Sequence, residues 1–315
     1  GSSLNYTFNS NVLFWDNLEC TNASSRGEIG TKNLRIIFAK THIFDGEATI
    51  SGQLKTANDN YVLGLSGSAE GFLCSELFRD NDNFGQELLR AEHIEGRGEV
   101  SGRMNLVWDN QGVWDSNSFD AELHASISNG RLKNLEVFDE IADYLKENRL
   151  MAPLVDPEDL RRRLADVSFD YVETPVSVSM SSVSLPFTNI QSSAMNVSLE
   201  GDQTFEGSIN YSLGFALRDL RDNKQGEFGN IQDDGLGNMF FLGMDGTLDE
   251  PVYSYDRKAH KAHRRRAINS EAQRIKDALT KEDVDDSFKP EKKKENNPSW
   301  RQNTNDLDDP EDDDF

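Results

Sequence analysis

The sequence predicts a mainly β protein, a long curved antiparallel sheet accompanied by a few short helices and a C-terminal helix. Apolar and polar residues alternate over many short segments, as in strands with one apolar and one solvated face. Turn residues recur about every ten residues between these segments, which is typical of strands joined as a meander. Only 36% of the residues are hydrophobic. That content suits a sheet with one wet face better than a sheet covered by helices on both faces.

The clearest local unit is residues 119–145, which we interpret as a strand, a tight turn and an amphipathic helix. Apolar residues alternate from Phe119 to Ile127, and Asn129-Gly130 then supplies two residues that tolerate positive φ. Beyond them the apolar spacing lengthens to three or four residues, which predicts a helix over 132–147. We expect Phe138 and Ile141 on this helix to contact the sheet and to cap one end of its apolar face.

The segments before this unit continue the strand pattern, with one interruption. Alternation is clear at 33–40, 47–54, 61–71 and 94–108, whereas residues 72–92 predict one or two short helical turns around an Asn/Asp loop.

After the unit, Asp156-Pro157 starts a short helix predicted over 157–165, with Asp as N-cap and Pro at the first helical position. Strands then resume, and the longest alternating run covers 205–217. Residues 219–238 are charged and glycine-rich and predict a mobile loop. Residues 238–255 predict a final strand pair.

Composition divides the 315 residues into three parts. Residues 1–256 form the predicted β domain. Residues 257–282 lack glycine and proline and predict a basic helix. Residues 283–315 are poor in apolar residues, carry a lysine-rich block and an acidic end, and predict a disordered tail.

Charge and motifs argue against several classes of function. The net charge of −23 repels nucleic-acid phosphates. No apolar run reaches the ~20 residues of a transmembrane helix, and no signal peptide is visible. Motifs of serine hydrolases, dinucleotide-binding folds and P-loops are absent, so the chain is expected not to be an enzyme and to need no cofactor or metal. Cys20 and Cys74 can either pair in an oxidising compartment or remain free.

Two features point to binding. A series of one-faced strands with few helices must bury its own apolar face in a sandwich or curved sheet, or hold something apolar, such as lipid chains. The basic cluster is either a solvated helix surface or a contact for anionic lipid headgroups or an acidic partner. Its residues are Arg257, Lys258, Lys261, Arg264, Arg265 and Arg266.

Several weak motifs, in the right order over residues 10–256, resemble the C-terminal region of the AsmA-like envelope proteins, relatives of the TamB-type bridge-like lipid transfer proteins. The matching positions are Asn129-Gly130, Leu135, Phe138, Ser193-Ala194-Met195, Gly201, Phe205-Glu206-Gly207, Ile209, Tyr211 and Gly246 to Pro251.

The resemblance implies a groove-like or taco-like sheet that carries phospholipid between the two membranes of a bacterial envelope. It also implies a periplasmic protein anchored to the inner membrane by a preceding segment, with a role in outer-membrane biogenesis and no catalytic residues. The alternative is a scaffold or assembly factor for outer-membrane or secretion machinery. Apolar strand positions are the candidate lipid contacts, although alternation alone does not separate groove from core. They are Ile50, Leu54, Val100, Met104, Leu106, Leu123, Ile127, Ile209, Leu213 and Phe215.

Overall fold

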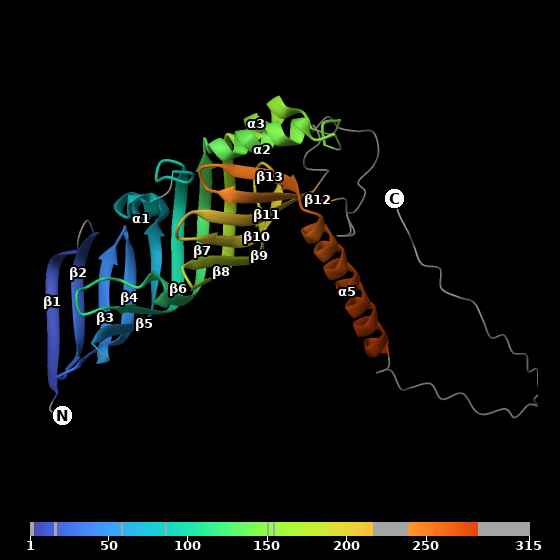
Figure 1. Cartoon of the computed structure of the whole chain (residues 1–315). Coiled ribbons are helices and arrows are strands. Elements are labelled where there is room, and N and C mark those ends of the chain that lie inside the picture. The colour runs from blue at the N-terminus through green and yellow to red at the C-terminus, as the bar shows by residue number, and fades with distance from the viewer. Residues whose placement is uncertain are drawn as a thin grey trace, which may run out of the picture. The chain divides into compact units, whose positions relative to one another are not determined.

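The computed structural model describes residues 3–15, 18–57, 59–85, 87–149, 151–153, 155–216 and 239–282 (Figure 1). The chain divides into two compact units, Gly1–Ala267 and Ile268–Phe315. The first unit contains the whole sheet described below. The second contains the later part of the C-terminal helix.

The described part of the protein is mainly β, as predicted. A single 13-stranded sheet follows the chain order from β1 to β13, and every neighbouring pair is antiparallel. Because β1 and β13 are the two edges of this order, the sheet is open rather than closed. The strands are β1 (Leu4–Trp15), β2 (Leu18–Ile29), β3 (Asn33–Ile43), β4 (Gly46–Ala57), β5 (Asn60–Leu73), β6 (Ile94–Trp108), β7 (Asp120–Lys133), β8 (Asp166–Ser179), β9 (Ser182–Gln191), β10 (Asn196–Thr204), β11 (Ser208–Ala216), β12 (Met239–Thr247) and β13 (Pro251–Tyr255).

The helices occupy the positions where the strand pattern breaks. They are α1 (Cys74–Asp80), η1 (Asp82–Gly85), η2 (Ser116–Ser118), α2 (Glu136–Glu147), α3 (Pro157–Leu164) and α5 (Arg257–Glu282). The start of α3 is the predicted one. The Asp156 carboxylate accepts hydrogen bonds from the backbone N–H groups of Glu158 and Asp159, at 3.0 and 3.3 Å.

The predicted turn at Asn129-Gly130 is wrong. Both residues lie inside β7, and α2 begins only at Glu136. Asn129 has φ +49°, and there the pairing with β6 shifts register, so its positive φ accommodates a bulge instead of a hairpin. Gly130 is required for packing, because a Cβ there would lie 2.0 Å from the Phe169 ring.

Two sequence predictions fall outside the described residues. These are the mobile loop at 219–238 and the disordered tail at 283–315.

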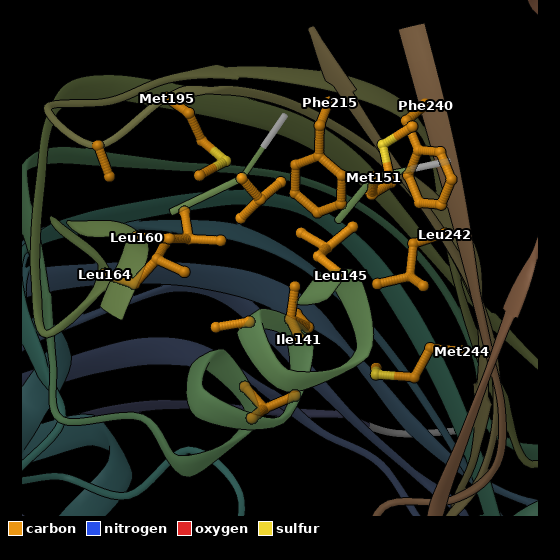
Figure 2. Packing of buried hydrophobic residues seen from close by; sticks show 14 of the residues in the cluster. Ile141, Leu145, Met151, Leu160, Leu164, Met195, Phe215, Phe240, Leu242 and Met244 are labelled. Carbon is orange, nitrogen blue, oxygen red and sulfur yellow. The ribbon is translucent and has the colours of Figure 1, made fainter. Parts of the chain in front are cut away.

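The main core lies between the helix pair α2–α3 and strands β10 to β13 (Figure 2). Ile141 and Leu145 of α2 and Leu160 of α3 point toward Phe215, Phe240 and Leu242 of the sheet. Leu145, Leu160 and Leu242 are fully buried. Phe138 is half-buried and packs against this cluster, and Ile141 is within it, so the predicted capping role of α2 is confirmed.

Candidate functional site

The sheet has one apolar face, and its strand pairing shows this directly. Residues opposite each other in antiparallel strands project to the same side of a sheet. One chain of opposed residues crosses the strands β1 to β6 and contains only leucine and isoleucine. Its members, in strand order, are Leu4, Ile29, Leu34, Leu54, Leu63 and Leu106.

Two further rows run beside it on the same face. The first consists of Ile36, Gly52, Leu65, Met104, Ala121 and Val178. The second consists of Ile50, Gly67, Gly102, Leu123 and Val176. We call the part of these three rows that lies on β1 to β7 the open apolar face. Gly67 and Gly102 project no side chain, so the surface is lowest between Ile50 and Leu123.

The opposite side of the same strands is polar. Glu47, Glu70 and Glu99 oppose one another on β4, β5 and β6. Lys40 contacts the Glu47 carboxylate at 2.6 Å, and Arg103 pairs with Glu122 at 2.6 Å. This side is therefore the solvated one, and the apolar rows face away from it.

Helices cover only part of the apolar face. Over β10 to β13 it is closed by α2 and α3, as the buried cluster described above shows. There Tyr253 donates a 2.6 Å hydrogen bond to Glu140 of α2, and burial together with this carboxylate raises the pKa of the Tyr253 hydroxyl. A smaller cluster of Phe72, Cys74 and Ile94 lies where α1 joins β5 and β6.

The structure separates the predicted lipid contacts into three groups. Ile209 and Phe215 are buried in the main core and Leu213 packs against it, so these three are core residues. Val100 and Ile127 pack against the smaller cluster at α1. The remaining five are half-buried, or at 36% exposure in the case of Ile50, and belong to the open apolar face or its rows. They are Ile50, Leu54, Met104, Leu106 and Leu123.

The sequence interpretation missed several apolar residues of β1 and β2 that project to the same side of the sheet as the open apolar face. Leu4 and Ile29 belong to that face, and Leu4 is 74% exposed. Phe8 and Val12 lie on the same side of β1 and are also exposed. The alternation of apolar and polar residues over 4–12 could have indicated that β1 has an apolar side.

The basic cluster lies at the start of α5, within the first unit. Arg257, Lys258, Lys261, Arg264 and Arg265 are exposed. Arg266 is engaged with the sheet. Its guanidinium lies 3.0 Å from the Glu200 carboxylate and 4.6 Å from the centroid of the Phe187 ring. The cluster is thus a solvated helix surface with one docked arginine.

The two histidines of this helix lie against the sheet. The rings of His260 and His263 lie 6.1 and 5.3 Å from the ring of Phe241, which is buried on β12. Burial lowers the pKa of His263, and the neighbouring His260 and Arg266 lower it further.

Among the described residues, no group of three or more His, Cys, Asp or Glu side chains is arranged to hold a metal ion. Cys20 on β2 and Cys74 at the start of α1 are free, so the pairing alternative is not realised. Burial raises the pKa of the Cys74 thiol, which keeps it protonated. Within the described part of the chain, no helix is both long and apolar enough to span a bilayer.

Comparison with known proteins gives no match to a family model, to a curated protein or to a solved structure.

Proposed function

We propose that this chain is a non-enzymatic lipid-handling module that holds phospholipid acyl chains on the open apolar face. The observation that carries the proposal is the run of leucine and isoleucine across β1 to β6, which no described helix covers. In the cell we place it in the periplasm of a double-membraned bacterium, held at the inner membrane and moving phospholipid toward the outer membrane.

The chemistry of the face fits hydrocarbon. Its rows contain aliphatic side chains, the thioether of Met104 and glycine, and offer no side-chain N–H, O–H or oxygen atom. Each methylene removed from water contributes about 0.8 kcal/mol. About six methylenes laid on the face therefore contribute on the order of 5 kcal/mol, enough for a measurable complex. A polar headgroup is expected to remain at or beyond the strand ends.

The resemblance to AsmA-like envelope proteins supports the same function, since relatives of that kind are associated with lipid transport along a β groove. The sandwich alternative requires the sheet to bury its own face, whereas the buried parts of the face in the described residues lie beneath α2 and α3 and beside α1. The scaffold alternative rests on the basic helix and the charged tail as docking elements for a partner. The described basic residues form a solvated helix surface with one arginine, Arg266, docked on the sheet.

The test is lipid extraction from the purified chain followed by mass spectrometry, with a matched pair of variants on β4. Leu54→Asp places a charge on the open apolar face, and Gln53→Asp places the same charge on the neighbouring exposed position of the polar side. We expect phospholipid to copurify with the wild type and with Gln53→Asp, and to be lost from Leu54→Asp. Absence of exchangeable phospholipid in the wild type, or equal retention in both variants, would contradict the proposal.

A further inference from the structure

A second apolar surface lies at one end of the strands. Connections in an antiparallel meander alternate between the two ends of the sheet. The connections that contain α1, the pair α2–α3 and residues 192–195 are therefore all at one end. The connections 109–119, 180–181 and 205–207 are all at the other end.

Contacts between side chains join these three connections into one surface. The ring centroids of Trp114, Phe119 and Phe205 lie 6.0, 6.0 and 6.1 Å apart, so each ring contacts the other two. Ser181 donates toward Ser116 Oγ at 3.0 Å, which ties the β8–β9 turn to the 109–119 connection. We call this surface the aromatic turn surface.

The side chains at its tips are exposed. Val113 is 61% exposed, Trp114 48% and Phe205 40%, and Met180 at the β8–β9 turn is 83% exposed. Turn residues are ordinarily polar, and exposed apolar side chains gathered in one place are typical of an interaction surface.

The charge on this surface limits what it can bind. Residues 109–119, 180–181 and 205–207 include no lysine or arginine. The carboxylate of Asp109 accepts from the backbone N–H groups of Gln111 and Val113, at 2.9 and 2.8 Å, and that of Asp115 accepts from Asn117 N–H at 3.0 Å. These carboxylates shape the connection, and nothing in it attracts an anionic surface.

We infer that the aromatic turn surface docks the protein onto a zwitterionic lipid bilayer, with Val113, Trp114, Met180 and Phe205 entering the interface. Tryptophan is suited to this position because its ring is apolar while its N–H remains hydrated. Each connection offers one or two projecting apolar side chains, a form that penetrates a soft interface. The inference rests on the proposed function. Acyl chains must reach the open apolar face past the strand ends, and the connections that contain α1, α2 and α3 all lie at the opposite end.

The test uses vesicles of pure phosphatidylcholine and the full chain, with binding measured by co-sedimentation. Pure phosphatidylcholine is chosen because the exposed basic residues of α5 attract anionic vesicles independently. We expect Trp114→Ser, Met180→Ser and Phe205→Ser each to weaken partition by about tenfold, the amount that corresponds to a lost large apolar side chain. The matched control is Ile37→Ser on β3, which removes an apolar side chain of similar exposure, 44%, away from the three connections.

A second readout identifies the inserted side chain. Quenching of tryptophan fluorescence by brominated phosphatidylcholine is expected in the wild type and is expected to fall in Trp114→Phe, which keeps the other three tryptophans. Far-ultraviolet circular dichroism checks that each variant remains folded.

The outcomes separate this inference from the proposed function. If the surface variants lose vesicle binding but keep phospholipid loaded from detergent solution, docking and acyl binding are distinct, as inferred. If the wild type fails to bind vesicles, or if the surface variants bind like Ile37→Ser, docking is refuted even when lipid still copurifies. If the same variants instead abolish self-association in sedimentation velocity, the surface is a contact between copies and the inference is overturned.

Discussion

The distinction between closed core and open face can be tested with the same substitution at two positions. Leu242 on β12 and Leu54 on β4 are both leucines on interior strands, and both project from the apolar side of the sheet. Leu242 is fully buried beneath α2, whereas Leu54 is half-buried. Leu242→Ala and Leu54→Ala therefore differ chiefly in what covers the side chain.

The expected magnitudes follow from burial. At Leu242 the substitution removes transfer free energy and leaves a cavity among Leu213, Tyr255 and the α2 side chains, a combination that costs about 3 kcal/mol of unfolding free energy. At Leu54 water fills the vacated space, no cavity remains, and the cost is about 1 kcal/mol. For a unit of this size, about 3 kcal/mol corresponds to a fall in Tm of roughly 6–12 °C, and about 1 kcal/mol to roughly 2–4 °C.

The measurement is urea unfolding of lipid-free protein, followed by far-ultraviolet circular dichroism, with equal m-values required before midpoints are compared. A cost at Leu54 equal to that at Leu242 would refute the reasoning, because it would show that the face over β4 is covered in solution. Adding phospholipid should stabilise the wild type more than Leu54→Ala, since ligand binding raises apparent stability.

Three further predictions concern single contacts. The pKa of His263 is lower when its ring lies against Phe241 than when α5 is undocked, so protonation of His263 favours the undocked helix. Contact of α5 with Phe241 is thus strongest above the ordinary value of 6.5 and weakens as pH falls below it. Hydrogen exchange of residues 257–266, corrected for intrinsic rate, should show less protection at about pH 5.5 than at about pH 7.5, and His263→Phe should remove the difference. Gly130→Ala should cost about 1–3 kcal/mol through its clash with Phe169, measured by urea unfolding; failure of Phe169→Leu to restore part of that loss would point to another cause. Phe138→Asp should lower the free energy of unfolding by at least about 2 kcal/mol, whereas exposed Asp139→Ala should leave it nearly unchanged.

Much of the fold could be predicted because its determinants are local. Alternation places one apolar and one polar side on each strand, and antiparallel neighbours then align these sides without further information. The start of α3 is equally local, since Asp156 supplies the cap from within its own turn. Helix α2 was predicted for the same reason, because Ile141 and Leu145 recur at helical spacing.

Features that depend on distant residues were predicted incorrectly. Asn129-Gly130 has the composition of a hairpin turn, but the small size of Gly130 serves the Phe169 ring on the next strand. His263 reads as a residue of a basic, solvated helix, yet its ring lies against Phe241. In both cases the deciding partner is brought close only by sheet pairing or helix docking, which residue spacing does not encode.

The apolar face of the sheet shows most clearly the difference between features set by local sequence and features set by distant residues. Leu213 and Leu54 occupy equivalent places in an alternating strand, and nothing within either strand distinguishes them. Leu213 lies against α2 because the only long helical insertion in the described sheet follows β7 and packs back over the last strands. Leu54 lies three strands before that insertion, beyond the reach of α2 or α3. The position of the helices along the chain therefore determines which part of one apolar face becomes core and which part stays uncovered by α2 and α3, the part that we propose binds hydrocarbon.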